Sequence, residues 1–304
     1  MLSPDCCLNI CFGQYNDILQ ALRMCMGLGC NSVGVTGCRI IDSERERLIA
    51  ILTNSFMPCN GRFPTLIALI SIFFIGSASA FGSLLSALIL TVFVVTSVIV
   101  TLVVSKLLSS TLLSGKPSSF VLELPPYRTP QIGKVIVRSL LDRTVYVLGR
   151  AVMVAAPAGL FLWVLGNVYV GDATLLNFIA GYLQPVGNIM GMDGVMLLAF
   201  ILALPANETV IPVALMCYLK TGNLVEYESL SALKDIFVSN GWTLRNAICV
   251  CTFMLIHWPC STTLLTVKKE TGKWRWAALA FVLPTAIGII FCVTLNLIMS
   301  AIGL

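Results

Sequence analysis

The sequence predicts an all-α, polytopic integral membrane protein with about six to eight helices, some of them broken or re-entrant. Composition is the first indication, because 58% of the 304 residues are hydrophobic and only 11% are charged. Soluble domains carry about 25% charged residues. The second indication is length, since several apolar stretches reach the roughly 20 residues that a helix needs to cross a hydrocarbon layer. The third is a set of prolines and polar residues that interrupt these stretches.

Six apolar stretches are expected to span the membrane, and a further apolar piece lies near Ile18–Val35. The six lie at Phe63–Phe81, Ser83–Leu107, Thr144–Val170, Gly194–Leu219, Thr243–Val267 and Trp274–Ile302. Ahead of them, residues 1–17 lack the basic start, apolar core and cleavage site of a signal peptide. We therefore expect a poorly ordered leader there.

Basic residues in the loops indicate orientation, because cytoplasmic loops carry an excess of lysine and arginine. The loop Lys106–Arg143 has six basic residues against two acidic ones, so it is expected to be cytoplasmic. The basic segment Lys268–Arg275 belongs on the same side, which requires Gly194–Leu219 to be a re-entrant pair of half-helices broken between Pro205 and Pro212. By the same rule, four further residues are expected to be cytoplasmic: Arg39, Arg45, Arg47 and Arg62.

This pattern divides the chain into residues 18–108, a cytoplasmic connector at 109–143, and residues 144–304. Within the connector, Leu124–Pro130 is a stiff, extended, proline-rich segment. Apolar residues then recur at helical spacing, at Ile132, Val135, Ile136 and Leu140. That spacing predicts an interfacial amphipathic helix, although a solvated linker helix would explain it equally well.

Two groups of polar interruptions mark points where helices are expected to break inside the membrane. Broken backbone is tolerated at that depth only where it is buried in protein or lines a cavity. Both groups therefore point to a solute site near the bilayer midplane. The first group holds Gly27, Gly29, Cys30 and Asn31, followed by Pro58, Cys59 and Asn60. The second holds Pro205, Asn207 and Glu208, followed by Pro259 and Cys260.

Most of the twelve cysteines are expected to be small packing residues, because they show no disulfide spacing. Cys30, Cys59 and Cys260 differ, since each lies beside a helix breaker. A half-helix N-terminus favours the thiolate there, and a thiolate is a soft metal ligand. Oxygen donors accompany them at Asn31, Asn60, Asn207 and Glu208. This mixed donor set predicts a path for a borderline divalent ion such as Fe²⁺. The alternative is that Pro-Cys pairs occur in helices simply because cysteine is small.

Glu208 is a functional candidate because it is an ionisable residue inside an apolar segment, where burial costs several kcal/mol unless the group is paired or hydrated. Its alternative interpretation is a short outward loop in which the carboxylate is simply solvated. His257 is the only histidine. It fits a ligand or proton carrier and equally a packing residue.

Several stretches of the chain resemble FeoB ferrous iron transporters, in order along the sequence. The first gate motif of that family is matched by Gly27–Asn31, Gly37–Arg39, Glu44–Leu48 and Phe56–Arg62, its connector by Glu123–Pro130, its second gate by Asn207–Val210, and its closing helix by Trp258–Cys260 with Lys269–Gly272.

The resemblance covers roughly Gly27 to Gly288 and implies a permease for Fe²⁺ with two gate repeats, at 18–108 and 144–304. It implies that Cys30, Cys59 and Cys260 correspond to the cysteines proposed to line the iron path. It also implies that Glu208 is the acidic residue of the second gate. Asn207 stands where many family members have lysine, which weakens the case for an ion pair at Glu208.

FeoB proteins normally begin with a G-protein domain, and its phosphate loop, Gly-x-x-x-x-Gly-Lys-Ser/Thr, is absent from these 304 residues. We therefore expect a truncated, split or degenerate FeoB-like permease. Its nucleotide control would come from a separate G-protein domain, and a small accessory Feo protein is a further expected partner. Fe(II) is the expected transported substrate, with no permanently bound cofactor. The expected location is the plasma membrane, in contact with lipid and with further copies of the chain.

Other function classes leave no signature. The sequence has no catalytic motif and a single histidine, so we expect no enzyme. Its basic loops lack interleaved aromatic residues, so no nucleic acid partner is expected. Two alternatives to an iron permease stay open: a non-transporting membrane scaffold within a larger FeoB-type assembly, and a permease for a nucleoside-type organic solute. The choice among Fe²⁺, Mn²⁺, Co²⁺ and Zn²⁺ also stays open.

Overall fold

The computed structural model describes residues 24–303, apart from 42, 76–79, 172, 226–228 and, except for three positions, 112–144. Within this part of the chain every regular element is helical apart from one short antiparallel pair, β1 (Tyr169–Val170) with β2 (Ala173–Thr174). The all-α class is therefore confirmed. The expected leader at 1–17 and nearly all of the connector, with its amphipathic helix, lie outside the described residues.

The first half of the chain is a series of short helices that leads into one long helix. Residues 24–29 are helical, and they are followed by α3 (Asn31–Gly37), η1 (Cys38–Ile40), α4 (Glu44–Thr53), η2 (Asn54–Phe56), η3 (Asn60–Arg62), α5 (Phe63–Ile70), η4 (Ser71–Ile75) and α6 (Ala80–Ser110). Helix α4 begins where the Ser43 side chain accepts a hydrogen bond from the Glu46 N–H. The helices are short because Cys30 and Met57–Cys59 adopt extended backbone.

The second half repeats this alternation of helix and break. Its elements are α8 (Tyr146–Asn167), β1, β2, α9 (Leu175–Met190), α10 (Gly194–Leu202), η6 (Asn207–Thr209), α11 (Val210–Tyr218), α12 (Leu230–Ser239), α13 (Leu244–Ile256), α14 (Ser261–Thr271) and α15 (Trp274–Ile302). Side chains of Thr174, Asp193 and Ser229 cap the helices that follow them. Helices α10 and α11 pack against each other, and the chain between them is broken at 203–206. This break includes Pro205, whereas Pro212 lies within α11. That the two helices form a re-entrant pair stays a prediction.

Four helices are long and apolar enough to cross a membrane, at Glu44–Phe74, Gly82–Ser110, Leu244–Thr271 and Trp274–Ile302. The pair α9 and α10, bent by 104°, would make a fifth. Three of these match expected spans closely. The span expected at Phe63–Phe81 is corrected, because it begins at Glu44 and includes the break at Pro58. The hydropathy pattern divides it there because the polar residues around the break lower the local hydropathy.

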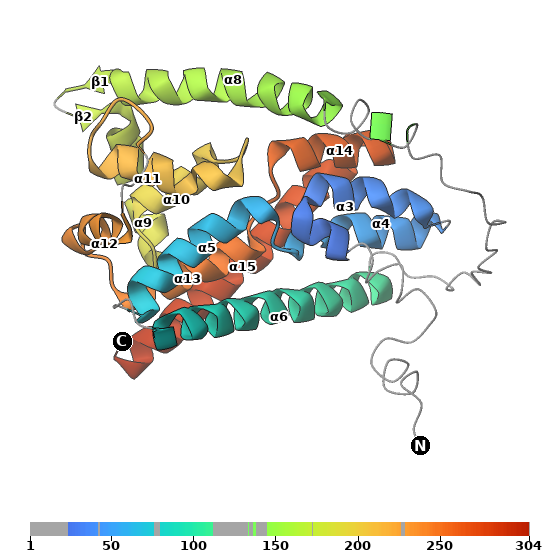
Figure 1. The fold of residues 1–304 in the computed structure, drawn as a ribbon, viewed down its shortest axis with the longest axis horizontal. Coiled ribbons are helices and arrows are strands. Elements are labelled where there is room, and N and C mark those ends of the chain that lie inside the picture. The colour runs from blue at the N-terminus through green and yellow to red at the C-terminus, as the bar shows by residue number, and fades with distance from the viewer. Residues whose placement is uncertain are drawn as a thin grey trace.

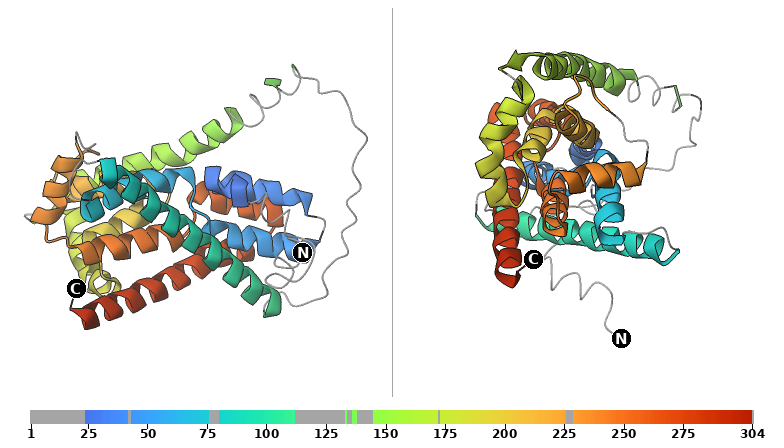
Figure 2. Two further views of the ribbon diagram at one scale, coloured as in Figure 1. Left: turned by 60° about the horizontal axis from the view of Figure 1, so that its bottom comes forward. Right: turned by 90° about the vertical axis from the view of Figure 1, so that its left-hand side faces the viewer.

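The two broken spans lie at the centre of the bundle. About 56% of the apolar window of Glu44–Phe74 and 67% of that of Leu244–Thr271 is buried, against 22% for Gly82–Ser110 and for Trp274–Ile302. Helices α6 and α8 lie on opposite sides of the bundle (Figures 1 and 2). Apolar side chains on α6 and α8 are exposed, for example Leu84, Val92 and Leu160. Broken backbone is thus covered by protein, whereas continuous helices face the lipid.

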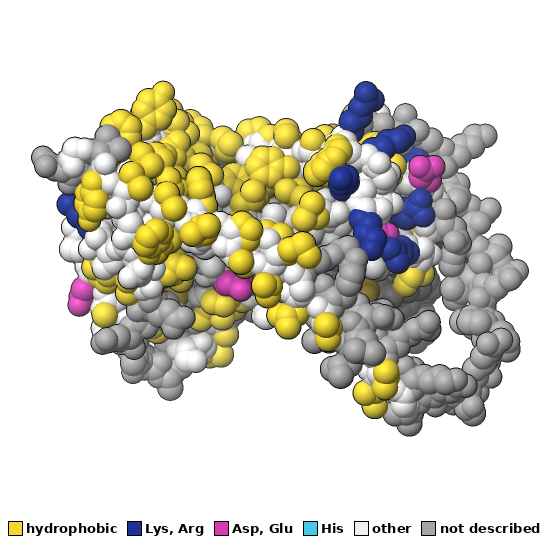
Figure 3. Space-filling model, turned by 90° about the horizontal axis from the view of Figure 1, so that it is seen from above, with side chains coloured by type: hydrophobic (Ala, Val, Ile, Leu, Met, Phe, Trp, Pro, Cys, Tyr) yellow, Lys and Arg dark blue, Asp and Glu magenta, His cyan; other side chains and the backbone are white. Residues whose placement is uncertain are grey.

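Basic side chains gather at one end of the molecule (Figure 3). Helices α3, α4 and α14 lie together at that end, and α5 and α13 extend away from it (Figure 1). Arg39 forms a two-bond ion pair with Glu270 there, at 2.6 and 2.7 Å. The segment around Arg39 and the basic segment Lys268–Arg275 therefore lie at the same end, as expected, whereas most of Lys106–Arg143 lies outside the described residues. Arg62 is the exception: it was expected to be cytoplasmic, but it is fully buried and bonds to carbonyls of both broken spans.

The bend between α9 and α10 depends on close backbone contact, which yields a stability prediction. A Cβ at Gly194 would press on the Ala180 carbonyl oxygen and lie 2.7 Å from the Gln184 nitrogen. We expect Gly194→Ala to lower the melting temperature in detergent by at least about 3 °C. Gly159→Ala on α8 is the control, because a Cβ there meets nothing within 4 Å. An equal effect of the two substitutions would contradict this account of the bend.

Candidate functional site

The first break separates the helix at 24–29 from α3 at Cys30, whose φ of −153° and ψ of 122° are extended. Asn31 follows and is buried. With its amide oriented to match its acceptors, Asn31 donates to the carbonyls of Met57 at 3.2 Å and Gly27 at 3.1 Å. Asn54 donates from Nδ2 to the Asn31 carbonyl at 2.8 Å. Side-chain amides thus bind backbone carbonyls around this break.

Gly27 is needed where it stands, because a Cβ there would lie 2.9 Å from Asn54 Oδ1. Gly34, on α3, faces the same Asn54 amide, and a Cβ at Gly34 would also be too close to it. Gly29, which the sequence grouped with Gly27, has open space where a Cβ would stand, with nothing within 4 Å. Gly27 and Gly34 therefore make room for Asn54, a residue that sequence reasoning did not single out.

The second break runs through Pro58 and Cys59, both buried in the middle of the span Glu44–Phe74. The chain turns back into helix at Asn60, which is exposed. Asn207, from the second half of the chain, donates from Nδ2 to Cys59 Sγ at 3.8 Å. This contact joins the first Pro-Cys break to the asparagine of the other group.

The third break lies between α10 and η6. Ala206 has φ −149° and ψ 112°, within 10° of the values at Cys30. Asn207 is buried and Glu208 is exposed. Glu208 lies beside η3, since a Cβ at Gly61 would be 2.9 Å from its Oε2. Pro205, which lies just before Ala206, is half-buried.

The fourth break, His257–Cys260, separates α13 from α14 at the middle of the span Leu244–Thr271. Cys260 Sγ contacts Thr263 Oγ1 at 3.2 Å. The Cys260 thiol lies within electrostatic range of Cys59 and Cys30. The Ser261 N–H donates to the Leu204 carbonyl at 2.8 Å and so ties this break to the third.

His257 occupies a packing position at the end of α13. Its Nδ1 lies 2.9 Å from the Met254 carbonyl oxygen, which can only accept, so Nδ1 carries the proton. The ring contacts Phe200, Phe253 and Trp258. Its side chain is buried. This arrangement corresponds to the packing interpretation of His257.

The four breaks form two equivalent pairs. Each half of the chain places an extended residue before a buried asparagine, Cys30-Asn31 and Ala206-Asn207, and later a Pro-Cys break in the middle of a span. Because α4 lies with α14 and α5 with α13, the two broken spans run in opposite directions. This is the geometry of inverted repeats, whose interface is the usual place for a solute site in transporters.

Unsatisfied polar atoms also concentrate at these breaks. Five buried side-chain atoms have no hydrogen-bond partner in the described structure: Asn54 Oδ1, Ser55 Oγ, Arg62 Nε, Trp258 Nε1 and Ser261 Oγ. All five residues lie in or directly beside the two Pro-Cys breaks. Buried polar groups are nearly always paired, so a group of exceptions in one place indicates a site that interacts with something polar.

A closed metal site is not formed by the described residues, which contain no group of three or more His, Cys, Asp or Glu side chains placed to hold an ion. Of the predicted path residues, the structure brings Cys30, Cys59, Cys260 and Asn207 toward one centre. Asn31 follows Cys30 directly, and its side-chain amide donates to backbone carbonyls. Asn60 and Glu208 lie on the exposed side of the same region.

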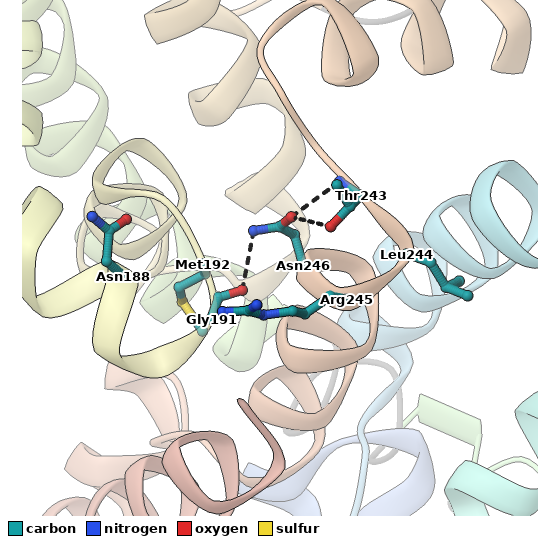
Figure 4. Close-up of a pocket in the computed structure, with 7 residues that line it drawn as sticks. All are labelled: Asn188, Gly191, Met192, Thr243, Leu244, Arg245 and Asn246. Atoms are coloured by element: carbon teal, nitrogen blue, oxygen red, sulfur yellow. Dashed lines mark hydrogen bonds between the residues drawn. The ribbon is translucent and has the colours of Figure 1, made fainter. Parts of the chain in front are cut away.

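A separate cavity of about 440 Å³ lies at the start of α13 (Figure 4). Asn246 lines the cavity. Its side chain donates to the Gly191 carbonyl at 3.2 Å and accepts from Thr243, the N-cap of α13. Arg245 donates to Asn296 on α15 at 2.8 Å. The polar groups of this cavity therefore connect α9, α13 and α15, and the cavity contains none of the predicted path residues.

Sequence reasoning missed the roles of Arg62 and Asn54, and the threonines of α14. Thr263 contacts Cys260, and Thr266 contacts Ser32 of α3 at 2.7 Å. The run Ser261-Thr262-Thr263 with Thr266 was a usable signal, since hydroxyls at helical spacing in an apolar span have to meet polar partners. Nothing in the sequence showed that Arg62 turns inward.

Fold and site together define a class: a polytopic α-helical membrane protein in which two broken, oppositely directed spans lie together at the centre. Comparison with known proteins is more specific. A family model described as ferrous iron transport protein B C terminus matches residues 90–142. A second, described as nucleoside recognition, matches residues 148–274. No solved structure matches.

Curated relatives named Fe(2+) transporter FeoB match most of the chain. That of Staphylococcus aureus (strain MSSA476) is 30% identical over 272 residues, covering 86% of this chain and 38% of the relative. That of Methanocaldococcus jannaschii is 25% identical over 296 residues, covering 93% of this chain and 41% of the relative. The chain thus spans about two fifths of the length of these relatives. The resemblance to the FeoB family is confirmed, and the chain is a multi-pass protein of the plasma membrane.

The amide of Asn54 yields a second stability prediction. Asn54→Ala removes the bond to the buried Asn31 carbonyl, and leaves a gap opposite Gly27. We expect the free energy of unfolding to fall by about 1–3 kcal/mol. Asn240→Ala is the control, because Asn240 makes a similar bond to a backbone carbonyl at an exposed helix end, where the change should stay within about 0.5 kcal/mol. Chemical denaturation in detergent measures both, and equal effects would contradict the assigned role.

Proposed function

We propose that this chain is a permeation unit for ferrous iron, in which Fe(II) passes a cysteine-lined polar centre between the two repeats. The proposal is carried by the placement of Cys59 and Cys260 in the breaks at the middle of the two central spans, with the Cys260 thiol within electrostatic range of Cys59 and Cys30. Relatives that match most of the chain are named as Fe(2+) transporters, which supports the same substrate.

Each residue has a role in this proposal. Glu208 and Asn60, on the exposed side, attract the hydrated cation and begin to replace its water. The cysteine sulfurs then take the ion, and each thiol releases its proton as it binds. A borderline metal accepts sulfur ligands more readily than Mg²⁺ or Ca²⁺ does. The amide of Asn207, already bonded to Cys59, orients that thiol. Asn31 supports the break at Cys30 by binding the carbonyls of Met57 and Gly27.

Loose clustering of the thiols is consistent with transport. Conduction requires binding that is favourable enough to admit an ion and weak or divided enough to release it. The three thiols do not surround a single point. They are therefore better suited to binding an ion one after another than to holding it permanently. The prolines at 58, 205 and 259 keep the breaks open, and rocking of the repeats about them would expose the centre to each side in turn.

Partners and energy source belong to the same proposal. These 304 residues contain no phosphate loop, so any GTP control would come from a G-protein domain outside them. A relative in Porphyromonas gingivalis, 23% identical over 311 residues, is named as a fusion of Fe(2+) transport protein A with FeoB, which favours a small accessory Feo partner. Association of several copies in the membrane would complete the assembly. Fe(II) is the substrate, with no resident cofactor.

A second candidate rests on the model described as nucleoside recognition, which matches residues 148–274. A nucleoside-type solute would use the asparagine amides and the Trp258 N–H of the breaks and would not need the thiols. The third possibility is a non-transporting scaffold within a larger FeoB-type assembly. The two tests below separate these three possibilities.

The first test is iron influx into liposomes that contain the purified chain and a trapped chelating dye, under anaerobic conditions. We expect influx that falls about tenfold or more in a Cys30→Ser, Cys260→Ser double variant, because metal sites lose at least this much when donors are removed. The matched control is a Cys217→Ser, Cys251→Ser double variant, in which two buried helix cysteines are replaced. Influx in that control should stay close to the unsubstituted level.

Influx equally reduced in both double variants would contradict a cysteine-lined path. Influx no greater than in empty liposomes would favour the scaffold, which acts only inside a larger assembly.

The second test is uptake of a labelled nucleoside into the same liposomes. We expect no saturable uptake, because the thiols are the shared feature of the centre and a nucleoside has no use for them. Saturable uptake that survives in the Cys30→Ser, Cys260→Ser variant would contradict the iron proposal and support the organic solute.

A further inference from the structure

Arg62 is a fully buried arginine between the two central spans, with all four Nη protons bound to backbone carbonyls. Nη1 donates to Leu255 at 2.8 Å and Ser55 at 3.3 Å. Nη2 donates to His257 at 3.1 Å and Trp258 at 3.2 Å. Two of these carbonyls belong to the break after α13, one to the last turn of α13 and one to η2. The side chain therefore joins the two repeats at the middle of the membrane.

The carbonyls are available because the helices end there. The Leu255 carbonyl would normally accept from the N–H of residue 259, which is Pro259 and has none. Beyond the end of α13 at Ile256, the chain is extended at His257, so the carbonyls of His257 and Trp258 also lack helical partners. Such groups cannot stay unpaired at membrane depth.

No carboxylate of the described residues balances the guanidinium, whose hydrogen bonds all go to carbonyls. The thiols of Cys59 and Cys260 lie within its electrostatic range. The equivalent position in the second repeat, three residues after Cys260, is Thr263, which contacts the Cys260 thiol. Arg62 thus has no counterpart, and one repeat supplies the cation for carbonyls that belong mostly to the other.

Converging backbone carbonyls at a broken helix are ligands for hard cations such as Na⁺, K⁺ and Ca²⁺. Four of them meet here. We propose that Arg62 is a tethered cation: its guanidinium occupies a carbonyl cage between the two Pro-Cys breaks and so denies that cage to small inorganic cations.

The cage explains selectivity by exclusion. Arg62 occupies the oxygens of the cage and holds a positive charge among them. The centre therefore offers a mobile cation mainly sulfur and carboxamide ligands. Ions that prefer oxygen lose the site they would otherwise favour. This consequence rests on the proposed iron path, whereas occupancy of the cage by Arg62 does not.

The test uses thermal unfolding of the full chain in detergent at constant ionic strength. Arg62→Ala should unfold at a temperature lower by at least about 5 °C. Millimolar guanidinium should restore much of that loss, and K⁺ or Na⁺ should restore part of it relative to choline, because each can enter the vacated cage. Urea, which is neutral, should not. The unsubstituted chain should show none of these responses.

Arg39→Ala is the matched control, because Arg39 binds a carboxylate at an exposed end of the molecule and is 60% exposed. Guanidinium should not stabilise it. A folded Arg62→Ala variant that responds to none of the cations, or an Arg39→Ala variant that responds equally, would overturn the proposal.

Arg62→Lys keeps the proposal testable if Arg62→Ala yields no folded protein. Lysine keeps the charge but offers three donors on one compact group, so it cannot reach all four carbonyls and its unfolding temperature should fall by at least about 3 °C. An unchanged unfolding temperature in Arg62→Lys would overturn the proposal that Arg62 occupies a carbonyl cage. None of these measurements uses iron, so rescue by guanidinium without iron influx would retain the cage and reject the iron path.

Discussion

Every polar backbone group released by a broken helix has to find a partner inside the protein, because lipid supplies none. The remainder of this structure follows from that constraint. The Pro-Cys breaks occupy the most buried spans, and their free groups are met by Asn31, by the His257 ring, by the Leu204 carbonyl at the third break and above all by Arg62. Asn31, Leu204 and Arg62 each reach from one break to another, so the breaks support one another.

The two halves of the chain share a pattern of breaks but differ in chemistry. Cys30 and Ala206 share one conformation, yet only Cys30 carries a thiol. Arg62 and Thr263 occupy equivalent positions, and one is a cation while the other is a hydroxyl. A duplicated scaffold thus surrounds an asymmetric centre, in which sulfur lies on three of four equivalent positions. Such asymmetry lets the two sides of the membrane meet different ligands in one site.

The all-α class, three of the long helices and the approximate positions of the four breaks were predictable, because proline, glycine and hydropathy act locally. The 104° bend between α9 and α10 was not predicted. Burial of Arg62 was not, since an arginine next to a span normally snorkels to the surface and its inward turn depends on carbonyls nearly 200 residues away in sequence. The role of Asn54 was equally hidden, because it depends on room left by Gly27 and Gly34. Which thiols lie near one another could not be predicted either, because this depends on how the two halves of the chain pack together, and the spacing of residues along the sequence does not show that.

The place of the breaks within their spans has an electrical consequence. By residue number the midpoint of Glu44–Phe74 is Cys59, and that of Leu244–Thr271 falls between His257 and Trp258. A cation at this centre has crossed about half of the transmembrane potential. Since one charge crossing the whole field gains about 2.3 kcal/mol per 100 mV, a divalent ion gains about that much on reaching the centre and about as much again on leaving it. An inside-negative voltage alone would therefore draw such an ion inward in two equal steps.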